Sequence, residues 1–261
     1  MPIIESCIKD VFSWLVANKL SANPNKTEYL LFHSRNINPQ AININLNSGI
    51  ISPSYSAKNL GVLFQSDMSL DNHISSIIKS CFVQLRDFRR IRPLISKTAA
   101  ITLANSFIHS RLDYCNSLFY GLPNYSIHRL QKVQNTAARI VTHTTRFSHI
   151  TPILKSLHWL PINYRINFKI CCITHRVLSL HEPRYLSSLV KLRSNSHSLR
   201  SSSFSPLLLP HFNKKSHGLR SFSYAAPHLW NHLPNNVRTA QTYLFFRKNL
   251  KTYYFNQAFP T

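Results

Sequence analysis

The chain has 261 residues, enough to bury a sizeable core and to form two or three structural units. Its hydrophobic content of 44% excludes a wholly disordered protein, and no apolar run is long enough to span a bilayer. Lysine and arginine number 31 against eight acidic residues, a net charge of +23 that favours a polyanionic partner. We therefore expect RNA, DNA or an RNA–DNA duplex as the partner and no membrane, although an anionic membrane surface would suit the charge second best.

The first 66 residues predict one helix and several short strands. Apolar residues recur at helical spacing over residues 3–20. Strand-like runs follow at residues 29–32, 42–46, 50–51 and 59–64, and Ser48-Gly49 suits a hairpin turn. We expect a small antiparallel sheet beside one helix. The first residues lack a signal-peptide pattern, so we expect an intracellular protein, nuclear or cytoplasmic, that is not secreted.

The next predicted helix ends at Arg92-Pro93 and has two contrasting faces. Apolar residues recur at three- and four-residue spacing from Ile74 to Phe88. The basic residues lie mainly on the other side, with one on the flank and one at the end: Lys79, Arg86, Arg89, Arg90 and Arg92. A helix of this kind could hold a nucleic-acid backbone by its phosphates.

Residues 97–143 predict two helices separated by Gly121-Leu122-Pro123, because glycine tolerates a left-handed cap and proline cannot continue a helix. The second helix carries a stripe at steps of three and four: Arg129, Lys132, Thr136, Arg139 and His143. The stripe could bind nucleic acid or could be an ordinary solvated face. In the first helix, Arg111 falls within the apolar arc, whereas Asp113 points away from it. A buried Arg111 would need a carboxylate, carbonyl groups or a phosphate as its partner.

The remaining chain predicts more helices around an irregular segment. Helices are expected over residues 151–157, 162–177, 225–233 and 242–254, the last with an aromatic side that includes Phe245 and Phe246. Residues 191–220 are basic and rich in serine, and we expect them to be partly irregular, with a short strand at 207–209. The predicted class is α+β and mostly helical. Its parts are a strand-containing segment at 1–66, a helical bundle at 67–145, a helical connector at 146–190 and a basic C-terminal segment at 191–261.

Few residues of this chain could support catalysis or hold a metal. Two-metal phosphoryl transfer needs converging carboxylates, and the eight acids include no Asp-Asp or Asp-x-Asp. The chain has no phosphate-binding glycine motif, and its five cysteines form no CxxC pair. His228 and His232 have a chelating spacing but no obvious third ligand. The residues argue against a complete enzyme, and we expect neither a metal site nor a cofactor.

Several segments follow the order of one known family. They are WLVANKLSANPNKTEYLLF at 14–32, KNLGVLFQSDMSLDNHI at 58–74, SRLDYCNSLFYGLP at 110–123, LQKVQNTAARIVT at 130–142, HITPILKSLHWLPI at 149–162 and GLRSFSYAAPHLWNHLP at 218–234. The chain thus resembles the downstream part of the reverse transcriptase of non-LTR (LINE-type) retrotransposons, an RNA-directed DNA polymerase. The segments span nearly the whole chain, and their combination and order are more specific than any one of them.

The resemblance implies roles for these segments. NPNKTE is similar to the end of the polymerase palm, where Lys26 matches a lysine proposed to assist pyrophosphate departure. Leu60-Gly61-Val62 is similar to the turn that grips the primer end. The helices of residues 71–143 resemble the thumb, which holds the template–primer duplex by its phosphates. Residues beyond them resemble the post-polymerase region.

The family's catalytic aspartates, which bind Mg²⁺ in the intact polymerase, lie upstream of the matching segments. The resemblance therefore predicts a truncated fragment from a decayed element that keeps the distal palm, the thumb and nonspecific affinity for nucleic acid. Two alternatives are a non-enzymatic basic interaction or scaffold protein, and an enzyme in its own right.

Overall fold

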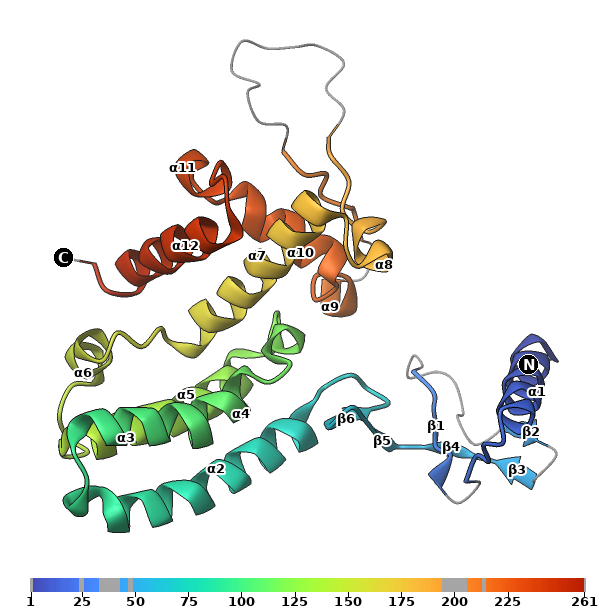
Figure 1. Cartoon of the computed structure of the whole chain (residues 1–261), viewed down its shortest axis with the longest axis horizontal. Coiled ribbons are helices and arrows are strands. Elements are labelled where there is room, and N and C mark those ends of the chain that lie inside the picture. Colours follow the sequence, from blue (N-terminus) through green and yellow to red (C-terminus); the bar gives the residue numbers. More distant parts are fainter. Residues whose placement is uncertain are drawn as a thin grey trace. The chain divides into compact units, whose positions relative to one another are not determined.

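The computed structural model describes residues 2–23, 26–32, 43–46, 49–193, 206–212 and 215–260. The chain divides into two compact units, Met1–Ser75 and Ser76–Thr261, which we describe separately. Short strands occur in the first unit, whereas helices form the second (Figure 1). The prediction of a mostly helical α+β protein is confirmed.

The first unit contains helix α1 (Pro2–Ala17) and three pairs of short strands. Strands β2 (Ile44–Leu46) and β3 (Gly49–Ile51) are antiparallel, as are β5 (Ser56–Asn59) and β6 (Val62–Gln65). Strand β1 (Tyr29–Leu30) instead pairs in parallel with β4 (Pro53–Ser54). The prediction of one antiparallel sheet is therefore wrong, because the pairs stay separate and one of them is parallel. The predicted turn residue Ser48 lies outside the described residues.

A two-residue turn joins β5 to β6. Leu60 and Gly61 have φ angles of 46° and 83°. Positive values at both central residues are typical of the turns whose twist matches a hairpin. Gly61 adopts this conformation at little cost, whereas Leu60 does so with a branched side chain that is 84% exposed.

Helix α2 (Asp71–Ile91) begins where a side chain of strand β6 meets its first turn. The Oε1 atom of buried Gln65 accepts a hydrogen bond of 2.7 Å from the backbone N–H of Asn72. This contact satisfies one of the free N–H groups of the helix start. Further along α2, Cys81, Leu85 and Phe88 are buried, as the apolar spacing predicts.

The first of the two helices predicted in residues 97–143 is shorter and more irregular than expected. A 3₁₀ turn, η3 (Arg92–Leu94), precedes α3 (Lys97–Ala104), which continues as a π-helical turn, η4 (Asn105–His109), and then as α4 (Ser110–Asp113). Cys115 then turns left-handed with φ 50°, and a 3₁₀ turn, η5 (Asn116–Phe119), follows. The expected helix to Phe119 therefore ends at Asp113. Gly121, with φ 70°, follows the 3₁₀ turn and does not cap an α-helix.

The second helix of the pair, α5 (Asn124–Thr142), has the predicted length. It packs against α3, and Leu130, Val133, Ala137 and Val141 are fully buried along its inner face (Figure 1). Gln134 is also fully buried, so its amide must find partners inside the protein.

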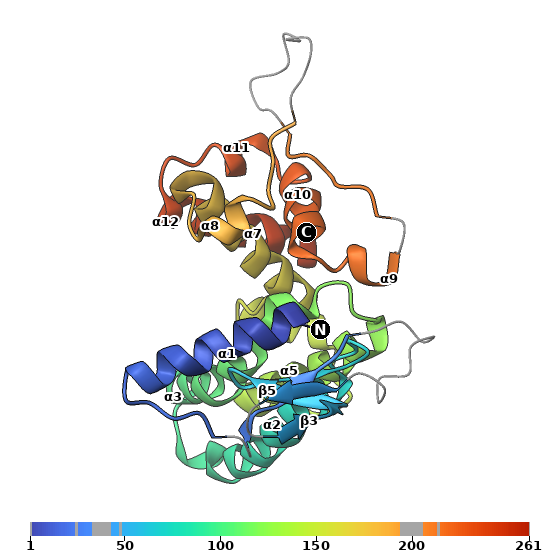
Figure 2. The ribbon, with the colours of Figure 1, turned by 90° about the vertical axis from the view of Figure 1, so that its right-hand side faces the viewer.

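Helix α7 (Ile162–Leu180) occupies the centre of the remaining structure and contacts α5, α10 and α12 (Figure 2). The other helices are α6 (Ile150–Ser156), α8 (Arg184–Ser187), α9 (Lys215–Gly218), α10 (Phe222–Asn231), α11 (Asn235–Arg238) and α12 (Tyr243–Ala258). On α12, Phe246 is buried as predicted, but Phe245 is 59% exposed. The expected aromatic side is therefore only partly docked.

The predicted strand at 207–209 is reduced to one antiparallel bridge between Leu192 and Leu207. The side-chain amide of Asn231 bonds both the N–H and the carbonyl of Leu207 at 2.9 Å. Much of the predicted irregular segment, residues 194–205 and 213–214, lies outside the described residues.

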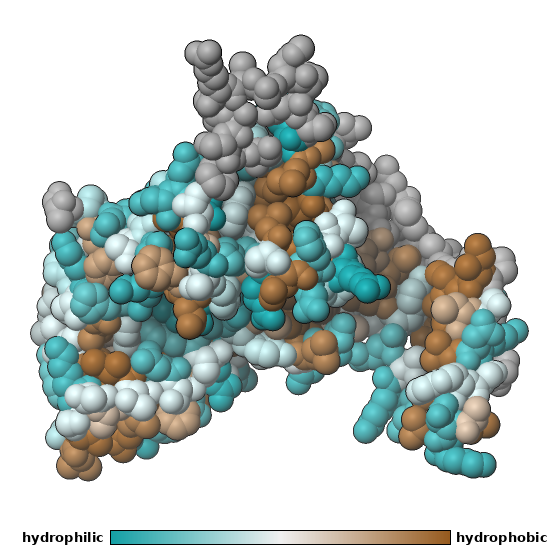
Figure 3. Space-filling view, turned by 45° about the horizontal axis from the view of Figure 1, so that its top comes forward, coloured by the Kyte–Doolittle hydropathy of each residue, from teal (hydrophilic) through white to brown (hydrophobic). Residues whose placement is uncertain are grey.

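Figure 3 shows hydrophobic residues on the visible surface among hydrophilic ones. Among the described helices, none combines the length and apolarity that a membrane span needs.

Candidate nucleic-acid interface

The basic residues predicted on α2 and α5 reach solvent to different degrees. Four on α2 and one on α5 are exposed: Lys79, Arg86, Arg89, Arg90 and Lys132. On α5, Arg129 and Arg139 are half-buried. The regular helix puts Arg129, Lys132, Thr136 and Arg139 on one stripe, as their spacing predicts.

Arg89 of α2 and Arg139 of α5 line the same pocket. It has a volume of about 440 Å³ and lies where the two helices end. Arg92, His143 and Arg146 also line it, and no carboxylate does. Four guanidinium groups around one cavity repel one another, so a bound anion would stabilise this arrangement. We call this cavity the arginine pocket.

Arg92 has a different role from the one predicted for it. Its side chain is buried, with 7% exposure, and its Nε and Nη2 atoms donate to the Val141 carbonyl at 3.1 and 2.7 Å. Its Nη1 atom donates to the carbonyl of Ile95 at 2.9 Å. Arg92 therefore caps the end of α5, where carbonyl groups lack helical partners. The expectation that Arg92 is a surface contact like the other basic residues is wrong.

Arg139 is held at the pocket by one contact and keeps an unused donor. Its Nη2 atom donates to the carbonyl of Ser148 at 3.2 Å. Its Nε atom is buried, and no hydrogen-bond partner for it lies within the described residues. A buried N–H group without a partner is costly, and a phosphate oxygen could accept from it.

Arg146 belongs to the pocket but was not predicted. It follows α5 in a loop, where helical periodicity gives no indication of side-chain direction. Its guanidinium carbon also lies 4.7 Å from the centre of the Phe147 ring, a cation–π distance.

The other predicted contacts do not line the arginine pocket; they are Lys79, Arg86, Arg90, Arg129 and Lys132. Arg86 and Arg90 each lie 3.9 Å from the carboxylate of Asp87, and all three side chains are more than half exposed. Such exposed pairs are weak, so both arginines remain available to a stronger anion.

The predicted polymerase-like residues belong to the first unit. Lys26 is exposed, and its backbone N–H donates to the Asn23 carbonyl at 3.1 Å. Leu60 and Gly61 form the exposed turn between β5 and β6, and Val62, the first residue of β6, is buried. Gly61 has a φ of 83°, a left-handed conformation that favours glycine.

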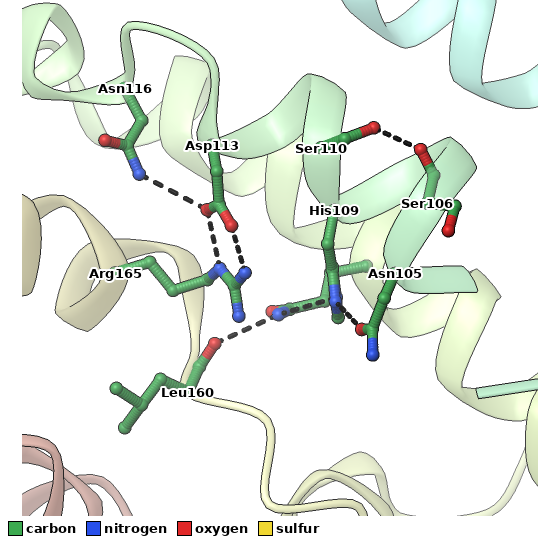
Figure 4. Close-up of polar contacts among 9 residues, drawn as sticks. Asn105, Ser106, His109, Ser110, Asp113, Asn116, Leu160 and Arg165 are labelled. Atoms are coloured by element: carbon green, nitrogen blue, oxygen red, sulfur yellow. Dashed lines mark hydrogen bonds and ion pairs between the residues drawn. The ribbon is translucent and has the colours of Figure 1, made fainter. Parts of the chain in front are cut away.

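Arg111 is not the buried arginine that its position predicts. Its side chain is exposed, and its Nη1 atom donates to the Ser80 hydroxyl at 2.7 Å. The π-helical turn of residues 105–109 shifts the helical phase just before it. A partly buried ion pair instead joins Asp113 to Arg165 of α7 through two hydrogen bonds, one of 2.8 Å from Nε (Figure 4). Asp113, predicted to point away from the apolar arc, therefore faces α7.

A chain of buried hydrogen bonds runs beside this ion pair (Figure 4). The Nδ1 atom of His109 lies 2.8 Å from Oδ1 of Asn105, an acceptor, so Nδ1 carries the proton. The amide of Gln134 then donates to Nε2 of His109 and to the carbonyl of Leu160 at 3.0 Å. Burial, followed by the charge of Arg165, lowers the pKa of His109 to about 3. His109 is therefore neutral near pH 7 and has a structural role.

Cysteines and closely spaced histidines are further described groups whose chemistry suits a site. Cys81, Cys171 and Cys172 are free and buried, and burial raises the pKa of Cys171 to about 12 and that of the other two to about 11. His228 and His232 have ring centres 4.8 Å apart. The described residues contain no group of three histidine, cysteine or acidic side chains that could hold a metal ion.

Comparisons with family models, curated proteins and solved structures gave no match to this chain.

Proposed function

We propose that the chain is a fragment of a LINE-type retrotransposon reverse transcriptase that binds the backbone of a template–primer duplex through α2, α5 and the arginine pocket. The order of the family-like segments and the net charge of +23 support this proposal. The observation that carries the binding function is the meeting of Arg89 and Arg139, from the two predicted basic helices, in a pocket whose described lining residues include no carboxylate.

Phosphate is the anion that suits this pocket. A guanidinium group presents a planar fork of N–H donors that matches phosphate oxygens, and a cluster of such groups attracts a polyanion from a distance. The exposed cations of α2 and α5 extend the positive surface beyond the pocket. Contacts of this type read the backbone and not the bases, so binding should be nonspecific in sequence.

The experiment is a salt titration of binding to a fluorescently labelled RNA–DNA duplex. Contact with about six to eight phosphates should give a slope of log affinity against log salt of roughly −5 to −7. The triple variant Arg89→Gln, Arg139→Gln, Arg146→Gln should make the slope shallower by about 2 to 3, because each lost phosphate contact contributes about 0.9. The loss should be the same for duplexes of unrelated sequence.

A matched control removes three exposed arginines elsewhere in the second unit: Arg176→Gln, Arg184→Gln and Arg193→Gln. This variant has the same net charge as the pocket variant but keeps the pocket intact. A flat salt response of the wild-type protein would refute backbone binding. Equal losses in the two variants would show that charge is used without the pocket, as expected for the alternative of a basic scaffold protein.

A further inference from the structure

A second basic cavity lies within the helical unit and shares no lining residue with the arginine pocket. It has a volume of about 520 Å³ and is lined by α7, α12, the segment before α7 and residues from α3 to η5. Arg165 and Lys169 of α7 and Arg247 and Lys251 of α12 line it, together with the aromatic residues Trp159 and Phe168. Its volume is in the range of small-molecule sites.

The charges of this cavity are unbalanced. Each helix contributes two cations four residues apart, a spacing at which like charges repel. Asp113 is the one carboxylate in the lining, and Arg165 already holds both of its oxygens. Within the described part of the chain, Lys169, Arg247 and Lys251 form no ion pair. An anionic ligand would therefore be stabilised by three cations.

The cavity also has an apolar side and a polar amide. Trp159 is 5% exposed and packs edge-on against neutral His109, with ring centres 4.2 Å apart. Phe168 lines the same cavity. Asn105, at the π-helical turn, uses Oδ1 for His109, and Figure 4 shows its amide nitrogen pointing away from that bond. An aromatic ring with hydrogen-bonding edges would find an apolar contact at half-buried Phe168 and a donor at Asn105.

We propose that this cavity binds a nucleoside phosphate, with the base against the aromatic side and the phosphate between Lys169, Arg247 and Lys251. The ligand is either a free mononucleotide or the 5′-terminal nucleotide of a strand, since both present the same chemistry. A phosphate alone would leave the apolar side unused, and a nucleoside alone would leave the cations unpaired. The proposal does not depend on duplex binding, because none of these residues belongs to α2 or α5.

Isothermal titration calorimetry of the full chain with adenosine 5′-monophosphate tests the proposal. Adenosine and inorganic phosphate should each bind at least about tenfold more weakly than the nucleotide, because each lacks one half of the ligand. A tetra-adenylate with a 5′ phosphate is then compared with the same oligonucleotide carrying a 5′ hydroxyl. Tighter binding of the phosphorylated strand than of the mononucleotide assigns the site to strand ends, and equal or weaker binding assigns it to free nucleotides.

The double variant Lys169→Gln, Arg247→Gln should weaken nucleotide binding at least about tenfold. Its control, Arg176→Gln with Lys248→Gln, also removes one lysine and one arginine from α7 and α12, at exposed positions outside the cavity. Equal losses in the two variants, or equal affinity for phosphate and nucleotide, would overturn the proposal. Displacement of the nucleotide by decanoate at similar concentration would also overturn it in favour of a fatty-acid site. Duplex binding by the Lys169, Arg247 variant reports separately on the proposed function.

Discussion

His109 makes the stability of the helical unit depend on pH. The ring is 4% exposed and keeps its proton on Nδ1, where Asn105 accepts it, while Nε2 accepts from Gln134. A second proton on Nε2 would break the contact with Gln134 and create a charge in the core. Burial, followed by the charge of Arg165, lowers the pKa of His109 to about 3, against 6.5 for an exposed histidine.

The direction in which pH changes the unfolding free energy follows from proton binding by the folded and the unfolded chain. Below pH 6.5 the unfolded chain binds a proton at His109, and the folded protein does not until the pH approaches 3. The contribution of neutral His109 to the free energy of unfolding is fully present above pH 6.5, and it is lost as the pH falls towards 3. Each pH unit in this window costs about 1.4 kcal/mol of unfolding free energy, so the loss at pH 5 is about 2 kcal/mol.

The assay is urea unfolding followed by tryptophan fluorescence at pH 7, 6 and 5, for the wild-type protein and His109→Gln. The variant loses the ring contact with Trp159 and should be less stable at pH 7. The difference in unfolding free energy between the wild-type protein and His109→Gln should shrink by about 2 kcal/mol between pH 7 and pH 5, since glutamine does not titrate. His73, His175 and His228 also have pKa values lowered by burial, but they are present in both proteins and cancel in the difference.

Val133→Ala is the control, because it destabilises the same buried region by about 1–2 kcal/mol without removing a titrating group. The difference in unfolding free energy between the wild-type protein and Val133→Ala should stay constant with pH. If the gap between wild type and His109→Gln were also constant from pH 7 to pH 5, the assignment of His109 as a buried neutral histidine would be refuted.

Three further substitutions have expected effects on stability. Arg92→Met should lower the unfolding free energy by about 2–4 kcal/mol in chemical denaturation, because the Val141 carbonyl loses its charged donors; an unchanged denaturation midpoint would contradict the capping role. Gly121→Ala should cost about 1–2 kcal/mol in the same assay, since its φ is 70° and the new Cβ would lie 2.7 Å from Cγ of Arg220; a neutral result would mean that the turn rearranges. Leu60→Asn should stabilise the β5–β6 hairpin by about 0.5–1 kcal/mol, seen as slower amide exchange in both strands, because asparagine tolerates the positive φ of 46°; faster exchange would count against the turn assignment.

Helical periodicity predicted the long helices because each buries one continuous face. The ranges of α2, α5 and α7 follow from apolar residues at three- and four-residue spacing, and the stripe from Arg129 to His143 follows from the same geometry. Positive charge also depends on composition alone. Helical periodicity depends on residues close in the chain, and net charge is a sum over all residues. The sequence by itself therefore determined both features.

Periodicity failed where a local event changes the helical phase. The π-helical turn of residues 105–109 and the left-handed Cys115 reversed the expected orientations of Arg111 and Asp113. No spacing rule predicts such a turn, because it accompanies contacts with distant segments, of His109 with Gln134 and of Asp113 with Arg165.

The tertiary structure alone decided which basic residues act together. Arg89 and Arg139 share a pocket because their helices end side by side, and loop residue Arg146 joins them. Arg92, which has the same charge and a neighbouring position, instead donates its hydrogen bonds to carbonyl groups of the protein. The sequence determined that the chain is basic and helical. Proximity between distant residues is a property of the packed chain, and it separates the arginines of the proposed binding surface from structural Arg92.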